Sequence, residues 1–199
     1  VAASYMNIPV IHTQGGDQTG SIDESVRHAI TKLSHIHFPA SEKSKERIIA
    51  MGEDPKFVFN VGCPSIDLIK ESNLIYREGI FKEAIGIGGK IDFTKPYVVV
   101  LMHPVTTKTE ETRKTINELL KAIIRIGKRN IQIVWLWPNI DSGAEIVSKA
   151  IRTSKDLYDL KNLHLYKNFP PDHYLVLIKN CKCLIGNSSS GLREAAYLG

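Results

Sequence analysis

The sequence predicts an α/β fold made of two Rossmann-like domains. Short apolar runs, many of them β-branched, alternate with longer amphipathic stretches along almost the whole chain, and this order is typical of parallel strands connected by helices. The strands read as near-continuous apolar runs, which indicates sheets covered on both faces. A glycine-rich segment at residues 86–90 interrupts the alternation, so we expect one domain on each side of it.

The N-terminal block, residues 1–85, is expected to be the C-terminal part of the first domain. Val26, Ile30 and Leu33 recur on one side of its first helix, which predicts that this side packs on a core. Ser41 precedes the next amphipathic stretch in the position of an N-cap. The expected strands are 8–12, 36–39 and 57–61, and the expected helices are 23–34, the one that follows Ser41, and 67–84.

The glycine-rich segment GIGGK opens the expected linker, residues 86–95. It resembles a phosphate loop only superficially, because it follows a helix and no helix with Ser or Thr follows its lysine. The C-terminal block, residues 96–199, then repeats the alternation. Its expected strands are 97–102, 131–136, 163–166 and 183–186, and its expected helices are 109–126, 142–153, 172–180 and 191–198.

The composition favours a globular protein that binds a small anionic molecule. The chain of 199 residues is 43% hydrophobic, which is enough for one large or two small cores. Its 26 basic residues are scattered among 21 acidic ones, whereas nucleic-acid-binding domains concentrate positive charge on one face. Apolar runs stay short of the roughly 18 residues of a membrane span, and the start lacks the order of a signal peptide. We therefore expect neither nucleic acid nor a membrane as a partner.

The three cysteines indicate a reducing compartment, and hence a cytoplasmic location, because an odd and low count does not build a disulfide scaffold. Cys181 and Cys183 lack the second pair that a zinc site needs, so we expect buried core thiols. The chain begins with Val1, and its last expected helix reaches Gly199. We therefore expect a fragment of a longer protein.

Candidate site residues follow the strands, because ligands of open α/β sheets bind beyond the carboxyl ends of the strands. The segment HTQGGDQTGSIDE, residues 12–24, is the first such place. Its glycines let the backbone approach a ligand, and Asp23 and Glu24 place carboxylates at a helix start. The alternative interpretation is a glycine turn with Asp23 as an N-cap, and the spacing alone slightly favours it.

Polar residues also follow two further strands. His103 follows the strand 97–102, where an imidazole can contact a phosphate or transfer a proton, although a lone histidine is more often structural. Asn139 and Asp141 follow the strand 131–136. They can bond the hydroxyls of a sugar or, alternatively, cap the next helix.

The segment GNSSSGLRE, residues 186–194, is the most specific of these places. A strand ends at Gly186, and small residues lead into a helix whose first N–H groups and positive dipole end bind phosphate oxygens. The hydroxyls of Ser188 and Ser189 add donors, and Glu194 can accept from ribose hydroxyls. Plain serine capping of a helix is the alternative.

Taken together, these segments resemble the UDP-N-acetylglucosamine 2-epimerase family over nearly the whole chain. The resemblance is greatest to the hydrolysing branch, which supplies the synthesis of sialic-acid-type sugars. Six segments in order are far more specific than any one of them. They are HTQGG (12–16), SIDESVRHAITKL (21–33), GCPS (62–65), HPVTT (103–107), PNID (138–141) and GNSS (186–189).

The resemblance implies a GT-B architecture, with the site in the cleft between its two Rossmann-like domains, and it implies no metal or redox cofactor. It also implies a nucleotide-sugar substrate and a homo-oligomer. The acid–base group would lie around Asp23, and the diphosphate and ribose contacts around His103 and the serines. The catalytic candidates are Asp23, Gln14, His103 and Glu24, and the substrate-binding candidates are Asn139, Ser188, Ser189, Glu194, Asp17 and Arg27.

Gln14 departs from the family pattern, since most relatives have Glu at this position. An amide does not take a proton from carbon, so Asp17, Asp23 or Glu24 is left to carry that role. Gln14 can instead bind an N-acetyl group, or mark a different substrate such as a diacetamido-trideoxy sugar nucleotide.

In the implied reaction, a base removes the proton on C2 while the nucleotide leaves C1. An unsaturated sugar forms, and water then adds to release the epimerised free sugar. Carbon acids need a positioned carboxylate, and the departing diphosphate needs donors that are already in place.

Two other functions stay open at this point. One is a GT-B glycosyltransferase, and the other is a non-catalytic sensor of nucleotide sugars. The carboxylates between residues 14 and 24 favour the epimerase, whereas Gln14 suits the sensor. The sequence leaves open whether the nucleobase is uracil or guanine.

Overall fold

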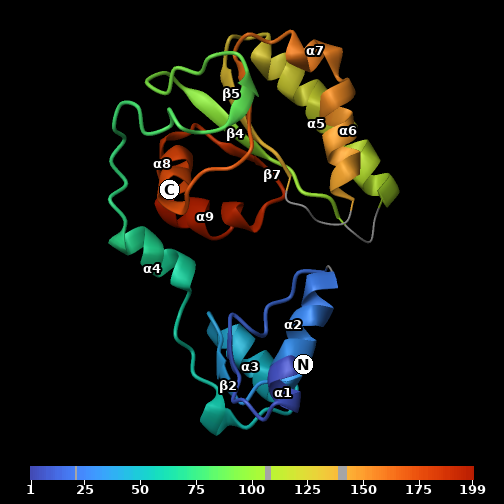
Figure 1. Ribbon diagram of the computed structural model, residues 1–199, viewed down its shortest axis with the longest axis vertical. Helices are drawn as coiled ribbons and strands as arrows, with labels where there is room; N and C mark the ends of the chain where they lie inside the picture. The colour runs from blue at the N-terminus through green and yellow to red at the C-terminus, as the bar shows by residue number, and fades with distance from the viewer. Residues whose placement is uncertain (21, 106–108, 139–142) are drawn as a thin grey trace. The chain divides into compact units, whose positions relative to one another are not determined.

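The computed structural model describes residues 1–20, 22–105, 109–138 and 143–199 (Figure 1). They form two compact units, Val1–Leu68 and Ile69–Gly199, which we call the N-terminal and C-terminal units and describe separately. Both contain parallel strands connected by helices, which confirms the predicted α/β class. Within the described ranges, no helix is both long and apolar enough to cross a membrane.

The N-terminal unit is built on two parallel strands, β1 (Ile11–Thr13) and β2 (Ile36–Phe38). Helix α2 (Ile22–Lys32) connects them, and α3 (Glu42–Ala50) follows β2. Ser41 caps α3 as predicted, because its hydroxyl accepts the backbone N–H of Ser44 at 3.2 Å. The other elements of this part of the chain are α1 (Ala2–Tyr5), the 3-10 helix η1 (Pro55–Phe57) and α4 (Pro64–Glu71).

Several expected elements differ from the prediction, beginning with the strand expected over 8–12, which starts only at Ile11 and ends at Thr13. Instead of a strand over 57–61, the structure has η1 and then a single parallel bridge between His37 and Val58. The helix expected over 67–84 ends at Glu71. Shortly after it, the side chain of Asn73 accepts the N–H of Ile75 at 3.3 Å, and such a local turn competes with helical hydrogen bonding.

The apolar side of α2 was predicted to pack on a core, but it is exposed. Val26 is 51% exposed, Ile30 41% and Leu33 37%. The buried residues of this unit include Ile48 and Val58, together with polar side chains such as Thr31 and His37. A pair of three-residue strands presents too little apolar surface to cover a whole helix face.

The C-terminal unit contains a five-stranded sheet whose first strand runs antiparallel to its neighbour and whose other strands are parallel. In sheet order the strands are β3 (Gly86–Gly88), β6 (Leu163–Tyr166), β5 (Gln132–Leu136), β4 (Tyr97–Leu101) and β7 (Leu184–Gly186). The helices are α5 (Thr109–Gly127), α6 (Ala144–Thr153), α7 (Lys155–Tyr158), α8 (Pro171–Asn180) and, after the 3-10 helix η2 (Ser189–Gly191), α9 (Glu194–Leu198).

Both faces of this sheet are covered, as the apolar strands predict. In Figure 1, α5 and α6 lie on one side of β4 and β5, and α8 lies on the other. Val98 and Val100 belong to the core shared with α5 and α6, whereas Val99 belongs to the core shared with α8. Each such side chain contributes about 1.5–3 kcal/mol by its burial, and this alternation fixes the register of β4.

The glycine-rich segment is part of the sheet and not a linker. Its residues Gly86–Gly88 form β3, which pairs with β6. The glycines are needed because a side chain at Gly86 would overlap the carbonyl oxygen of Leu165. The structure thus divides the chain between Leu68 and Ile69, ahead of the linker expected at residues 86–95.

Candidate functional site

The first candidate region is the segment of the N-terminal unit from the end of β1 to the start of α2, residues 14–24, which we call the carboxylate loop. Gln14 has a φ of 57° and Gly16 a φ of 81°, and the N–H of Gln14 donates to the carbonyl oxygen of Phe38 at 2.9 Å. Gly16 is buried so close to α3 that a Cβ would overlap the carbonyl oxygen of Ser44. The loop therefore turns sharply against α3, and a glycine is required at this turn.

Side chains from two helices hold the carboxylate loop. From α2, the Nη1 of Arg27 donates to the carbonyl oxygen of Asp17 at 2.8 Å. From α3, the Oγ of Ser44 donates to the carboxylate of Asp17 at 2.6 Å, and the guanidinium of Arg47 donates to the carbonyl oxygen of Gly16. Sequence analysis missed Ser44 and Arg47, although polar residues three apart share one helix face and were the available signal.

The carboxylates of Glu24 and Asp17 both accept hydrogen bonds, that of Glu24 from within the loop and that of Asp17 from Ser44 of α3. The carboxylate of Glu24 accepts the N–H groups of Thr19 at 2.7 Å and Gly20 at 2.8 Å, and these backbone bonds lower the pKa of Glu24. A carboxylate stabilised as an ion is a weaker base. Asp23 lies exposed in the first turn of α2.

Two histidines lie side by side next to this loop, since His12 of β1 and His37 of β2 are register partners. The Nδ1 of His12 is 3.2 Å from the hydroxyl of Thr31. Burial lowers the pKa of His12, and the charges of His37 and Arg27 lower it further. Burial also lowers the pKa of His37, against the opposing effect of Glu53. Both rings are therefore held in the neutral form more strongly than in water.

The second candidate region lies at the carboxyl ends of β4 and β7 in the C-terminal unit. The side chain of Asn187 accepts the N–H of His103 at 2.8 Å and donates to the carbonyl oxygen of His103 at 2.9 Å. This double hydrogen bond joins two segments that are far apart in the sequence. It fixes the backbone of His103 beside Ser188, as the position of both residues at strand ends predicts.

Gly186 brings the two strand ends close together. Its φ is 147°, and a Cβ at this position would overlap the carbonyl oxygen of Leu101 on β4. Only glycine combines this backbone conformation with such an approach.

The segment after β7 differs from the single helix expected over 191–198. It forms η2 first, and α9 begins only at Glu194. The Oγ of Ser188 accepts the N–H of Ser190 at 3.3 Å, which leaves its own hydrogen to donate. Ser190 is buried, and its Oγ accepts a hydrogen bond from the hydroxyl of Tyr174 at 2.8 Å. The donors available for an anion are thus the hydroxyls of Ser188 and of the exposed Ser189, rather than the start of a long helix.

Glu194 lies in the first turn of α9 and is partly buried. Burial raises the pKa of Tyr174, and the charge of Glu194 adds to that effect. The third predicted place lies outside the described residues, because Asn139 and Asp141 fall in the gap at 139–142.

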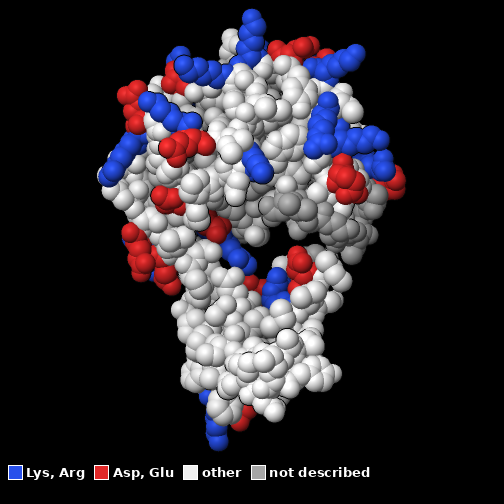
Figure 2. Space-filling view, in the orientation of Figure 1, with Lys and Arg blue, Asp and Glu red and all other residues white. Residues whose placement is uncertain are grey.

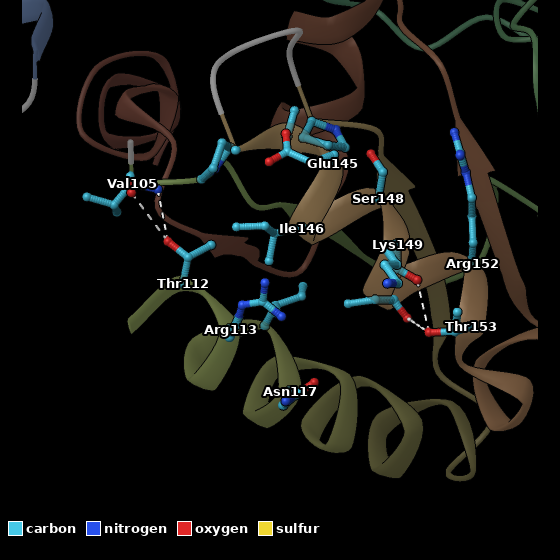
Figure 3. Close-up of a pocket in the computed structure, with 16 residues that line it drawn as sticks. Val105, Thr112, Arg113, Asn117, Glu145, Ile146, Ser148, Lys149, Arg152 and Thr153 are labelled. Atoms are coloured by element: carbon cyan, nitrogen blue, oxygen red, sulfur yellow. Dashed lines mark hydrogen bonds between the residues drawn. The ribbon is translucent and has the colours of Figure 1, made fainter. Parts of the chain in front are cut away.

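A groove of about 990 Å³ runs between α5 and α6 (Figure 3). Figure 3 shows Arg113 on α5 and Ile146 and Lys149 on α6 along this groove. Of the candidate residues that the structure describes, none lines it. On the face of the C-terminal unit shown in Figure 2, basic and acidic side chains are interspersed.

The cysteines differ from the expected core thiols. Cys183 is exposed and Cys181 is partly buried, because both lie in the turn between α8 and β7. Burial raises the pKa of the Cys181 thiol to about 11. Across the part of the chain that the structure describes, no three His, Cys, Asp or Glu side chains gather in a way that could hold a metal ion.

Comparisons with known proteins agree with this arrangement. Residues 1–199 match the family model described as UDP-N-acetylglucosamine 2-epimerase. A Legionella pneumophila protein named UDP-N,N'-diacetylbacillosamine 2-epimerase (hydrolyzing) is 35% identical over 98% of this chain and 49% of its own length. A Campylobacter jejuni protein named GDP/UDP-N,N'-diacetylbacillosamine 2-epimerase (hydrolyzing) is 34% identical over 96% of this chain and 48% of its own length.

Solved structures show the same fold. The UDP-GlcNAc 2-epimerase from Neisseria meningitidis, bound to UDP-GlcNAc, superposes with a TM-score of 0.70 at 20% identity, over 99% of this chain and 53% of that one. The Methanocaldococcus jannaschii enzyme, in complex with UDP-GlcNAc and UDP, gives a TM-score of 0.70 at 17% identity, over 98% of this chain and 53% of that one.

The chain spans about half the length of the curated relatives that it matches. Its fold is of the GT-B type, as the sequence predicts. Since the family model matches every residue, and relatives at 35% identity align over almost the whole chain, the chain belongs to the UDP-N-acetylglucosamine 2-epimerase family.

Proposed function

We propose that the protein that carries this chain is a hydrolysing UDP-N-acetylglucosamine 2-epimerase. It would convert the nucleotide sugar and one water molecule into UDP and a free sugar inverted at C2, such as N-acetylmannosamine. The observation that carries this proposal is the match of all 199 residues to the epimerase family. The relatives named as hydrolysing enzymes support the hydrolytic outcome.

The acid–base chemistry is assigned to the carboxylate loop. Asp23, which lies exposed in the first turn of α2, removes the proton from C2. Gln14 binds the N-acetyl group through its amide, which can donate and accept but does not take a proton from carbon. A positioned base of this kind contributes about 10²–10⁴-fold to the rate.

The leaving nucleotide is assigned to the strand ends of the C-terminal unit. As the bond at C1 breaks, negative charge grows on the diphosphate, and donors that are already in place stabilise it. Ser188 and Ser189 supply hydroxyls, and His103 supplies an imidazole on a backbone that Asn187 fixes. Glu194 accepts from the ribose hydroxyls, and the family resemblance adds Asn139.

A diacetamido sugar nucleotide is the second candidate substrate. Two relatives at 35% and 34% identity are named as 2-epimerases of diacetylbacillosamine nucleotides, and a relative from Neisseria meningitidis at 33% is named UDP-N-acetylglucosamine 2-epimerase. Gln14 fits the larger substrate, because an amide suits a second N-acetyl group.

The proposal extends to a cytoplasmic location, a homo-oligomer and a place in the synthesis of cell-surface polysaccharide. An Escherichia coli relative at 35% identity is named polysialic acid biosynthesis protein P7, which supports the last of these.

The test is to incubate the full protein in heavy water with UDP-N-acetylglucosamine, and separately with UDP-N,N'-diacetylbacillosamine. Free sugar and UDP are followed together. We expect a free sugar that carries deuterium at C2, and the preferred substrate is the one with the higher kcat/KM. Release that depends on an acceptor, with no label at C2, would indicate a glycosyltransferase. Binding without turnover of either compound would indicate a sensor.

A further inference from the structure

Helix α3 contributes two side chains, Ser44 and Arg47, that belong to no motif and both contact the carboxylate loop. We propose that they are positioning residues for the acid–base chemistry. They fix the turn at Gly16 and Asp17, and through it the placement of Gln14 and Asp23 at the two ends of the loop. The activity part of this inference rests on the proposed function.

The turn needs to be held from outside because its backbone is not in a relaxed conformation. Gln14 has a positive φ although it is not glycine, and Gly16 has one as well. Such conformations persist only where the surroundings over-determine them, and they cost about 1–3 kcal/mol for a residue other than glycine. Gly15 and Gly16 are both buried, so their carbonyl groups also need donors.

Arg47 supplies the donor for one of these carbonyls. Its guanidinium donates to the oxygen of Gly16, while Arg27 of α2 donates to the oxygen of the next residue, Asp17, at 2.8 Å. Two consecutive carbonyl groups are thus held by arginines from different helices. Without Arg47, the turn either leaves a buried acceptor unpaired or moves away from α3.

Ser44 holds the side chain of the same turn. Ser44 is buried, with an exposed fraction of 2%, and its hydroxyl donates to the carboxylate of Asp17 at 2.6 Å. A hydrogen bond to a charged acceptor is roughly twice as strong as one between neutral groups. Asp17 therefore acts as an anchor of the loop, through Ser44, and not as a proton acceptor.

The helix itself does not depend on these two contacts. Its N-terminus is capped by Ser41, and Ile48 packs it into the core with 0% exposure. Loss of the Arg47 side chain is therefore expected to loosen the loop and leave α3 folded. Lys43, an exposed cation on the same helix, offers a matched control.

The test compares Arg47→Ala, Arg47→Lys and Lys43→Ala in the full protein. We expect Arg47→Ala to lower kcat about 10–100-fold with the Kd for UDP within about twofold, because a displacement of about 1 Å is enough for such a loss and UDP lacks the sugar that the loop contacts. Arg47→Lys recovers part of it, since an ammonium lacks the planar fork. Added guanidinium ion restores part of the kcat of Arg47→Ala and leaves Lys43→Ala unchanged.

Amide hydrogen exchange of residues 14–20 is measured in the same proteins. We expect faster exchange in Arg47→Ala only, with the exchange of α3 unchanged. Wild-type kcat in Arg47→Ala, or a loss that equals its unfolded fraction and resists guanidinium, would overturn the proposal. If even the wild type turns over no sugar nucleotide, the proposed function fails. Hydrogen exchange alone then decides whether Arg47 holds the turn. Equal exchange in all variants then also overturns the positioning role of Arg47.

Discussion

The carboxylate loop of the N-terminal unit and the turn after β7 of the C-terminal unit are held in different ways. Side chains hold the first, because Arg27, Ser44 and Arg47 reach its backbone and its carboxylate from two helices. The second is held by close approach of the main chain, because Gly186 presses against Leu101 of β4, and by the single side chain of Asn187, which bonds the backbone of His103. A loop held by polar side chains can be altered one contact at a time, whereas a turn pressed against a sheet changes only together with the sheet.

The largest effect, a loss of catalytic rate, is expected at the carboxylate loop. Asp23→Asn keeps the size of the side chain but removes its basicity, so we expect kcat to fall by about 10²–10⁴-fold with the Kd for UDP nearly unchanged. UDP release and calorimetric titration with UDP measure the two quantities. Asp67→Asn, another carboxylate in the first turn of a helix, is the control and should retain activity. A large fall in melting temperature for Asp23→Asn would show that Asp23 serves only the stability of α2.

The next effect is expected at the turn after β7 and concerns stability. Gly186→Ala places a Cβ against the carbonyl oxygen of Leu101 in a conformation that L side chains rarely adopt, so we expect a loss of about 1–3 kcal/mol. Urea unfolding followed by circular dichroism measures it. In Gly191→Ala, the added Cβ meets only Leu184, at 3.8 Å, and we expect little change. Equal stability of the two variants would contradict the crowding argument.

A smaller effect is expected from the side chain of Asn187 in the turn after β7. Asn187→Ala removes both hydrogen bonds to the backbone of His103, so we expect a loss of about 1–2 kcal/mol together with weaker binding of UDP. Asn180→Ala removes one local bond to Val176 within α8 and serves as the control. Unchanged affinity for UDP in Asn187→Ala would separate this junction from the nucleotide site.

The smallest effect is the pH dependence of stability. The pKa values of His12 and His37 lie below the ordinary histidine value of about 6.5 in the folded protein, so the unfolded chain binds protons first. The stability that these two rings contribute is therefore complete above about pH 6.5 and is lost as the pH falls through the folded pKa values. Urea unfolding at about pH 7.5 and about pH 5.5 measures it. We expect His12→Gln and His37→Gln to reduce the difference, and equal wild-type stability at both pH values would contradict it.

Much of the C-terminal unit could be predicted from the sequence, because its strands are apolar throughout and its helices have one apolar side. The strand 163–166 has the predicted bounds, and β4, β5 and β7 differ by one residue at one end. The glycine-rich segment could not be predicted as a strand. Glycine carries no apolar pattern, and the reason for it lies in Leu165, a residue far away in the sequence.

The candidate site was predicted in part. The motifs locate Asp23, His103 and Ser188 at strand ends and helix starts, because these positions follow from local order. They do not reveal that Glu24 accepts N–H groups of the loop itself, or that Ser44 and Arg47 of α3 hold the loop. Such contacts join residues up to 31 apart, and local periodicity carries no information at that range.

The edge strand β3 has a practical consequence for dissecting this protein. It lies antiparallel along β6 and covers the hydrogen-bonding groups on that side of the sheet. A C-terminal piece that began after residue 90 would expose this edge of β6, and an exposed edge recruits other chains and promotes aggregation. A piece that began at Ile69, where the compact unit begins, would keep the edge covered and is the better choice for expression.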